Sequence, residues 1–338
     1  MTKRRARRRR GLRRLALLLV ATSAAVALLG AGAAWFFLDR YAGNVSRLPN
    51  VFVGLDQRPA ETPGSSTTFL LVGADTRANG QTTGSAAVAT ATNTRSDTIM
   101  LVRLAADGTH TQVVSIPRDS WVEVPGYGKN KINAAYAFGG PRLLVQTVEQ
   151  LTGVRIDHVA VVDFVGFTAV TDALGGVDVA IAAPTSQGGV SFNAGVNHLD
   201  GAQALAYVRE RYDLPGGDFD RVARQQNYLR SVLSKAKSDG LLTDPGRLDN
   251  FMRTATASIS VDDQLSNVDL VRLALDRRNA SPSDSSFLTA PVAGTGMEGD
   301  QSVVYLDQAA DAPLWDYLRQ DTLQVHLGEF TLLPTIPS

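Results

Sequence analysis

The chain has 338 residues, of which 44% are hydrophobic and 20% are charged, so it is long enough to bury a substantial core. Its formal net charge of zero conceals an uneven distribution, because residues 1–14 contain nine of the 33 lysines and arginines and no acid. The rest of the chain therefore carries 24 basic against 33 acidic side chains, which argues against a nucleic-acid partner for the main body of the protein.

Residues 15–38 form a run of 24 residues without a charged side chain. As a helix this run is about 36 Å long, against a hydrocarbon core of roughly 30 Å, so it predicts one transmembrane helix. The basic tail is expected to stay in the cytoplasm, which makes the protein a single-pass plasma membrane protein with its C-terminal part outside the membrane. A cleaved signal peptide is the alternative, since residues 31–33 resemble a peptidase site, but the apolar run continues five residues beyond it.

The part that follows is expected to begin with a stalk over residues 39–66, which are rich in Pro, Gly and Ser. Three short apolar segments then predict buried strands over residues 67–75, 97–105 and 111–117. Between the first two, residues 78–94 are small, polar and aperiodic, which predicts a mobile loop.

Helical patterns alternate with further strand patterns after these segments. Capping residues and apolar spacing predict helices over residues 141–153, 163–176, 200–208 and 218–238. The segments 158–163 and 176–181 are predicted strands. This alternation favours a layered α/β/α domain with a mixed central sheet. Residues 240–338 continue the pattern without an evident linker, so residues 67–338 are expected to form one domain.

Acids and arginines stand where the first three strands end or begin. Asp75 follows the first strand, Arg95 and Asp97 open the second, and Arg118 and Asp119 close the third. Ligands of α/β proteins bind at strand ends, where loops converge. Two carboxylates suit a hard cation such as Mg²⁺, and arginines hold phosphate oxygens in a bidentate way. Taken singly, each residue could equally form a surface ion pair.

The segment 204–226, ALAYVRERYDLPGGDFDRVARQQ, is dense in charge and interrupted by Pro-Gly-Gly. Arg209 and Arg211 are two residues apart and share no helical face, so the helix before them is expected to end there. Arg221 and Gln225 are four residues apart, and lie on one face of the first turns of the next helix. Donors at a helix N-terminus favour an anion, so the pattern predicts a site for a diphosphate.

Other charges of this segment are expected to be solvated or paired. Glu210 and Asp213 belong to this group. Arg224 points away from Arg221 by one helical step, and is predicted to pair with Asp220 across the turn.

The ordered motifs LLVGADTR, RSDTIMLVRL, VVSIPRDSWVEVPGYGKNKINAAYAFGG, LGGVDV, LDGAQALAYVRER and DFDRVARQQ resemble those of the LytR-CpsA-Psr family over about residues 67–237. The resemblance implies a membrane-anchored enzyme that transfers a glycopolymer from a polyprenyl diphosphate to peptidoglycan, through a phosphodiester bond and with Mg²⁺, or alternatively Mn²⁺. It implies Asp75 and Asp97 as metal ligands. The diphosphate contacts that it implies are Arg95, Arg118, Arg209, Arg211, Arg221 and Gln225.

Arg118, Asp75 and Asp119 are the expected catalytic residues, with either carboxylate considered as the proton acceptor. Lys131 and Asn133 lie in the K-I-N motif of the family and receive no assigned role. The segment between Asp75 and Asp97 is longer than the family's usual spacing. The family's prenyl chain occupies an apolar tunnel inside the domain.

Two other functions stay open on sequence alone. Water in place of the sugar hydroxyl would make the protein a polyprenyl-diphosphate phosphatase or pyrophosphatase. A non-catalytic envelope regulator that binds prenyl phosphates is the other alternative. The alanine-rich and arginine-rich composition favours arabinogalactan as the transferred polymer over teichoic acid or capsule.

Overall fold

The computed structural model describes residues 45–62, 64–75, 83, 95–211, 214–238, 244–277 and 279–334. The predicted basic tail (1–14), the predicted transmembrane helix (15–38) and, except for Thr83, the predicted loop (78–94) lie outside these residues. Among the helices of the described part, none combines the length and the hydrophobicity needed to cross a bilayer.

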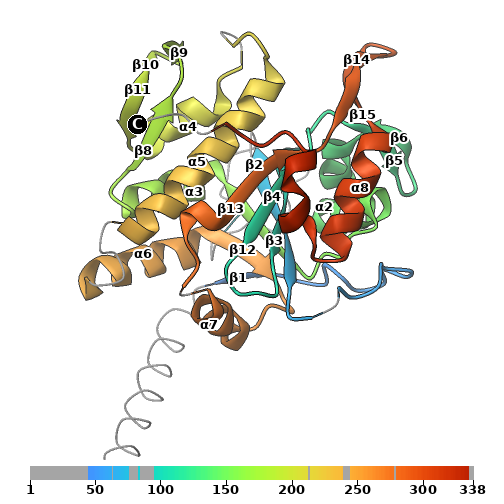
Figure 1. Cartoon of the computed structure of the whole chain (residues 1–338), viewed down its shortest axis with the longest axis horizontal. Coiled ribbons are helices and arrows are strands. Elements are labelled where there is room, and N and C mark those ends of the chain that lie inside the picture. Colours follow the sequence, from blue (N-terminus) through green and yellow to red (C-terminus); the bar gives the residue numbers. More distant parts are fainter. Residues whose placement is uncertain are drawn as a thin grey trace, which may run out of the picture. The chain divides into compact units, whose positions relative to one another are not determined.

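A seven-stranded mixed sheet forms the centre of the domain (Figure 1). In spatial order its strands are β1 (Ser46–Leu48), β12 (Ile259–Asp262), β7 (His158–Asp163), β2 (Thr67–Asp75), β3 (Arg95–Leu104), β4 (Thr111–Ser115) and β13 (Ser285–Thr289). Strand β2 runs antiparallel to β3 and parallel to β7, which confirms the mixed sheet. The predicted strand 67–75 agrees with β2 to the residue, because nine consecutive residues between turns fit a strand buried on both faces.

Different helices cover the two faces of this sheet (Figure 1). The helices of the described part are α2 (Ile132–Thr152), α3 (Phe164–Ala173), α4 (Gly201–Arg209), α5 (Asp218–Ser238), α6 (Pro245–Ser258), α7 (Asn267–Asp276), α8 (Gln308–Arg319) and α9 (Leu323–His326). Leu70 and Val72 share a core cluster with residues of α2 and α8. Leu71 packs in another cluster with Leu229 and Leu233 of α5. Since neighbouring residues of a strand point to opposite faces, β2 supplies both cores, and the predicted α/β/α layering is confirmed.

Four antiparallel two-stranded ribbons complete the described part. They are β5 (Trp121–Val124) with β6 (Gly128–Lys131), β8 (Val177–Ile181) with β11 (Gly195–Leu199), β9 (Thr185–Gln187) with β10 (Val190–Phe192), and β14 (Val292–Glu298) with β15 (Gln301–Leu306). The backbone N–H of Val304 in β15 donates to the carbonyl oxygen of Asp119, so the last ribbon is joined to the loop after β4.

Capping residues set the ends of the helices beside the cavity described below. Asp163 accepts a hydrogen bond from the backbone N–H of Gly166 and starts α3, as predicted. Asp200 and Gln203 form a capping box at the start of α4, which ends at Arg209 as expected.

The helix predicted over 141–153 is the second half of α2. Its first half begins earlier, and the two halves meet at non-helical backbone of Gly139 and Gly140.

The stalk predicted over residues 39–66 needs correction in the part that the structure describes. Strand β1 pairs in parallel with β12 at the edge of the central sheet. Val51 and Phe52 are buried in the core beneath α2 and α8. Burial of these side chains removes apolar surface from water, so the segment is held in the domain and is not a free linker.

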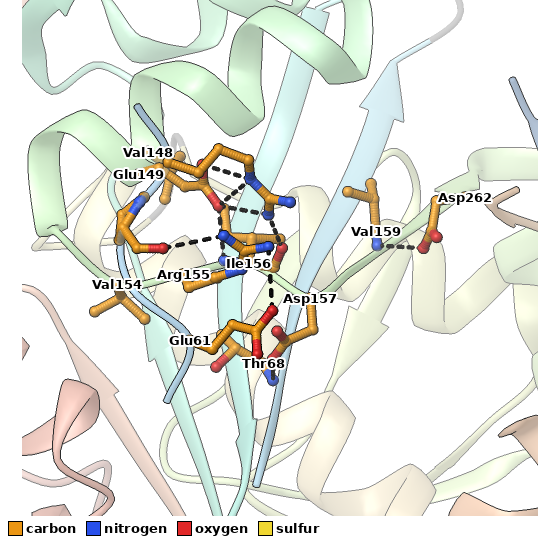
Figure 2. A network of polar contacts seen from close by, with 12 residues as sticks. Glu61, Thr68, Val148, Glu149, Val154, Arg155, Ile156, Asp157, Val159 and Asp262 are labelled. Carbon is orange, nitrogen blue, oxygen red and sulfur yellow. Dashed lines mark hydrogen bonds and ion pairs between the residues drawn. The ribbon is translucent and has the colours of Figure 1, made fainter. Parts of the chain in front are cut away.

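A polar network fastens the next part of this segment to the domain (Figure 2). Arg58 donates to both carboxylate oxygens of Glu149, and its Nη2 lies 2.7 Å from Glu149 Oε1. Glu149 also accepts a hydrogen bond from the backbone N–H of Ile156 (Figure 2). Asp157 accepts from the backbone N–H of Thr68 at the start of β2 (Figure 2). These contacts fix the segment before β2 at the end of the sheet opposite to Asp75.

Candidate active site

A cavity of about 700 Å³ lies between the sheet and helices α3, α4 and α5. Leu71, Met100, Phe167, Leu205 and Leu229 form part of its apolar walls. Six of the nine predicted site residues line the same cavity: Asp97, Arg118, Arg209, Arg211, Arg221 and Gln225. The fold thus brings arginines from the loop after β4 and from α4 and α5 to one apolar cavity of a size typical for a ligand site.

A β-bulge directs Asp97 toward this cavity. In the register of β2 and β3, Gly73 pairs with Thr98 and Ala74 pairs with Ser96, so Asp97 is the additional residue on β3. Two successive residues of a bulged strand can then face the same side of the sheet. Asp97 and Thr98 both line the cavity, whereas strict alternation would turn one of them to the opposite face.

Asp97 begins a chain of ion pairs through the charged part of the cavity. Its Oδ1 accepts a hydrogen bond from Arg118 Nη1. Arg118 Nη2 lies 3.4 Å from Asp218 Oδ1, and the same oxygen lies 2.7 Å from Arg221 Nη2. Asp218 therefore holds two guanidinium groups close together, although one belongs to the loop after β4 and the other to α5.

These two arginines retain hydrogen-bonding capacity that the described part of the chain does not use. The Nε of Arg118 and both the Nε and Nη2 of Arg221 are buried, and none of them makes a hydrogen bond within the described residues. Arg221 Nη2 is at hydrogen-bonding distance from Asp218, but that contact is an ion pair without hydrogen-bond geometry. A buried donor without a partner costs about 1–3 kcal/mol, so this arrangement favours an incoming acceptor.

Burial and neighbouring charges act differently on the two guanidinium groups. Burial lowers the pKa of Arg118, but the carboxylates of Asp97, Asp218 and Asp119 outweigh this effect, and its pKa is raised. The pKa of Arg221 is lowered, because burial outweighs the attraction of Asp218, and the positive charges of Arg118 and Arg211 act in the same direction as burial. Both groups remain cationic at neutral pH, since their ordinary value is 12.5. An anion bound beside Arg221 would stabilise its buried positive charge.

Arg209 and Arg211 reach the cavity from the end of α4. The guanidinium carbon of Arg209 lies 4.5 Å from the ring centroid of Phe164, a cation–π contact with the first residue of α3. Arg211 follows the helix end and lines the cavity, as does Gln225, one turn along α5 from Arg221. The predicted helix end after Arg209 thus places the two arginines on different parts of the backbone at one cavity.

Three predicted site residues are not in the cavity walls: Asp75, Arg95 and Asp119. Asp75 and Arg95 are directly opposite each other on β2 and β3, and opposite residues share a face of the sheet. Asp75 has the same strand parity as Leu71 and Gly73, which line the cavity, so this pair lies on the cavity face at its edge. Asp119 instead contacts Lys131 Nζ at 3.2 Å and Arg118 Nε at 3.7 Å.

Arg224 lies outside the cavity walls, as predicted, but its predicted ion pair with Asp220 is wrong. Its Nη2 donates to Thr185 Oγ1 at 2.7 Å, and its guanidinium carbon lies 4.6 Å from the ring centroid of Tyr207. Asp220 accepts from the backbone N–H of Gly216 and shapes the turn before α5. Glu210, expected to be solvated or paired, is fully buried. Asp213, also expected to be solvated or paired, lies outside the described residues.

Asp218 joins the charged cluster although the sequence analysis does not select it as a site residue. It lies in the first turn of α5 and forms ion pairs with both Arg118 and Arg221. The spacing of Asp218 and Arg221, three residues apart on a helix, indicates their pairing. The contact with Arg118 could not be found in this way, because it joins positions 100 residues apart in sequence.

The donor chemistry at the cavity is compatible with a magnesium ion. Asp75 and Asp97 lie on the same face of the sheet, and carboxylate oxygens are the protein ligands that Mg²⁺ prefers. Among the described residues, no group of three or more histidines or acids is arranged as a metal site. Mg²⁺ commonly takes only one or two carboxylates and completes its shell with waters and substrate phosphates, so two carboxylates fit its needs.

Comparison with known proteins supplies independent information on this arrangement. A model of the LytR_cpsA_psr family matches residues 54–319. The cell wall biosynthesis protein LcpA of Corynebacterium glutamicum is 32% identical over 325 residues, a match that covers 85% of this chain and 62% of LcpA. The polyisoprenyl-teichoic acid–peptidoglycan teichoic acid transferase TagU of Enterococcus faecalis is 36% identical over 188 residues, or 55% of this chain and 60% of TagU. The chain thus spans about three fifths of the length of these two relatives.

Solved structures show the same fold. A structure of TagT bound to LI-WTA has a TM-score of 0.61 and 26% sequence identity, and the match covers 82% of this chain and 99% of TagT. The likeness thus extends over the α/β/α layers that surround the cavity.

Proposed function

The chain belongs to the LytR-CpsA-Psr family, and on that premise we propose that it transfers a glycopolymer from a polyprenyl diphosphate carrier to peptidoglycan. The bond formed is a phosphodiester. LcpA and TagU, which are similar to this chain, carry names that refer to cell wall biosynthesis and to teichoic acid transfer to peptidoglycan. The proposal extends the chemistry named for TagU to this protein.

The observation that carries the proposal is the pairing of an apolar cavity with buried guanidinium donors. Arg118 and Arg221 keep buried N–H groups that no hydrogen bond satisfies within the described residues. A substrate that matches this site has an apolar part and a strongly anionic part. A prenyl diphosphate has both, since its hydrocarbon chain suits the cavity walls and its phosphate oxygens suit the guanidinium forks.

The proposed reaction exchanges one bond to phosphorus for another. A sugar hydroxyl of peptidoglycan attacks the phosphorus that bears the glycopolymer, and the new P–O bond forms as the bond to prenyl phosphate breaks. The hydroxyl proton passes to a carboxylate, for which Asp75 and Asp119 are the candidates. Prenyl phosphate leaves with the electron pair of the broken bond.

Positive charge around the diphosphate would stabilise this transition state. Arg118 and Arg221 are fixed by Asp218, and we propose that they stabilise the equatorial phosphate oxygens and the leaving phosphate. Arg209, Arg211 and Gln225 are proposed to bind the same diphosphate, and Arg95 to contact it from the edge of the cavity. Preorganised cations of this kind lower the barrier because they need no reorientation during the reaction.

We propose Asp75 and Asp97 as the residues that hold Mg²⁺, or Mn²⁺ in its place. The ion, when bound, would neutralise negative charge on the diphosphate. We further propose that residues 15–38 anchor the protein in the plasma membrane, with the catalytic domain outside it, where carrier lipid and peptidoglycan meet. The alanine-rich and arginine-rich composition of the chain supports arabinogalactan as the transferred polymer.

A transfer assay with the full chain in detergent tests the proposal. The donor is a polyprenyl diphosphate that carries a short labelled glycan, the acceptor is uncrosslinked peptidoglycan, and Mg²⁺ is present. We expect label on peptidoglycan with the parent chain and a loss of at least about 100-fold with Arg118→Ala. Arg277→Ala is the matched control, because Arg277 donates to the backbone of Ala105 and His110, near the opposite end of β3.

Each product pattern has one meaning. Labelled peptidoglycan that resists washing and is released by phosphodiester cleavage supports the ligase. Labelled glycan phosphate in solution with unmodified peptidoglycan would show a hydrolase instead. No turnover by the parent chain with any donor, together with tight binding of the prenyl diphosphate, would support a regulator and overturn the enzyme. Donors with arabinogalactan-type and teichoic-acid-type linkage sugars, compared side by side, identify the polymer.

A further inference from the structure

Two aromatic side chains form an exposed stack between the ribbon that follows Arg118 and helix α2. The rings of Tyr127 and Phe138 have centroids 4.6 Å apart and an interplanar angle of 20°. Tyr127 is 54% exposed and Phe138 is 44% exposed. Single exposed apolar residues are ordinary on protein surfaces, but two large rings stacked in contact and open to water form a surface patch that requires an explanation.

The backbone around these rings presents them openly. Tyr127 lies in the tight turn between β5 and β6, flanked by Gly126 and Gly128, both with positive φ. A Cβ added at either glycine would meet no atom within 4 Å, so the space around the turn is open. Phe138 is the last residue before the non-helical Gly139 and Gly140 in α2. Gly126 and Gly128 thus place no side chain of their own beside the ring of Tyr127.

Hydrogen bonds join this aromatic platform, defined as Tyr127 and Phe138, to the candidate active site. The backbone N–H of Asn133 donates to the carbonyl oxygen of Arg118 at 3.1 Å. Lys131, at the end of β6, contacts Asp119. Phe138 is five residues along the helix from Asn133, which is a rise of about 7.5 Å. The backbone of Phe138 is thus about 7.5 Å along the helix axis from the residue that is hydrogen bonded to Arg118, and the platform is itself not part of the cavity walls.

We propose that the aromatic platform binds the glycan strand of the acceptor, which makes it the acceptor subsite of the transfer reaction. The proposal rests on the proposed function. One face of a pyranose ring presents C–H groups, and these pack on the negative face of an aromatic ring, while the hydroxyl groups point outward to water. An open stack of two rings suits a long polymer that must enter and leave sideways, unlike the enclosed cavity.

The division of binding groups favours the acceptor over the donor. The donor has an apolar chain for the cavity and a diphosphate for the arginines. The glycan strand of the acceptor has neither a hydrocarbon tail nor a diphosphate, so it needs another binding surface. Its hydroxyl must nevertheless be fixed near phosphorus for rapid transfer. The platform supplies such contacts on the element whose first turn is hydrogen bonded to Arg118.

Kinetics of the full chain with variants of the platform test this inference. For Tyr127→Ala with Phe138→Ala, we expect the KM for uncrosslinked peptidoglycan strands to rise about tenfold, with the KM for the donor unchanged. Tyr127→Phe and Phe138→Tyr keep the stack and should restore the parent KM. Val325→Ala, at an 80% exposed position, serves as a surface control that should change neither constant. An unchanged acceptor KM in the double variant, or an increase in the donor KM alone, would overturn the inference.

Direct binding separates this inference from the proposed function. Retention of the full chain on peptidoglycan strands, without donor, should fall about tenfold in the double alanine variant. If the parent chain transfers nothing, but is retained on the strands more strongly than the double variant, the proposed function fails and the platform stands. Equal retention of parent and variant overturns the platform, whatever the transfer assay shows. A defect that occurs only in lipid bilayers and is absent in detergent would assign the rings to the membrane surface and equally overturn it.

Discussion

Arg221 and Arg224 lie three residues apart on α5 and are both buried, yet their guanidinium groups have different surroundings. Arg221 lines the cavity and has two buried nitrogens without a hydrogen bond within the described residues. Arg224 donates to Thr185 and stacks on Tyr207. Replacement of each by lysine keeps the charge and removes the planar fork, so the pair of variants isolates the role of the fork in diphosphate binding.

The expected size of the effect follows from the donors involved. A hydrogen bond to a charged group contributes about 1.5–3 kcal/mol, and lysine can replace at most one of the two that Arg221 offers. Arg221→Lys should therefore lose about 1.5–3 kcal/mol of transition-state stabilisation, a decrease of about 10- to 100-fold in kcat/KM for the donor. Arg224→Lys disrupts the hydrogen bonds of the guanidinium group to Thr185 and to the Tyr207 carbonyl oxygen, together with its stacking contact, which lowers the free energy of unfolding by roughly 1–3 kcal/mol.

The assay combines transfer kinetics with unfolding of the same preparations. Initial rates at several donor concentrations give kcat/KM, and urea unfolding gives the stability of each variant. Arg224→Lys should keep kcat/KM within about threefold of the parent at a temperature where it is folded. The reasoning is refuted if both variants lose the same factor in kcat/KM, or if Arg221→Lys transfers as well as the parent.

Three further predictions concern the pH dependence of stability, the bulge and the metal. Burial, with a neighbouring carboxylate, raises the pKa of Asp311 to about 7, so the folded chain keeps a proton that the unfolded chain releases above about pH 4. The free energy of unfolding should therefore fall between about pH 4 and 7 and level off above pH 7. In urea unfolding, Asp311→Asn should remove this slope and raise the free energy of unfolding by up to roughly 4 kcal/mol at pH 8. An unchanged slope would contradict this prediction. A Cβ at Gly73 would lie 2.9 Å from the Cβ of Thr98, beside the bulge. Gly73→Ala should therefore displace Asp97 and lower kcat/KM at least about tenfold. Kinetics like those of the parent chain would refute this prediction. Chelation of Mg²⁺ should abolish transfer reversibly. Asp97→Asn and Asp75→Asn should each raise the Mg²⁺ concentration that gives the half-maximal rate by about tenfold or more. Undiminished transfer with a chelator would exclude a role for the metal.

Most elements of the central sheet and of the layers around the cavity could be predicted because their sequences carry local signals. The strand 67–75 and the helix 218–238 agree with β2 and α5 to the residue, and Asp163 caps its helix as expected. Strand β12 was missed because it has only four residues and is recognised by its pairing with β7, not by its own pattern. Helix α6 was missed although Asp244 and Pro245 provide an ordinary N-terminal signal.

The candidate site was predictable as a set of residue types, but not as a geometry. Motifs identify Arg118 and Arg221, whereas their distance from each other depends on how α5 crosses the sheet. The bulge at Asp97 depends on the register between β2 and β3, and no residue within β3 predicts it. The role of Asp218 likewise required tertiary structure, since its contact with Arg118 joins two distant parts of the chain.

What separates the arginine proposed to bind the diphosphate from the structural one is the use of its hydrogen-bond donors, and not its charge or its burial. In segment 204–226, Arg221 and Arg224 are 4% and 8% exposed, so exposure does not distinguish them. Arg224 has partners in Thr185 and Tyr207, whereas Arg221 is held at one point by Asp218 and keeps donors unsatisfied beside an apolar cavity. Because a buried unsatisfied donor is costly, a fold that retains several at one cavity favours an anion there, and an apolar lining favours an anion that carries a long hydrocarbon chain.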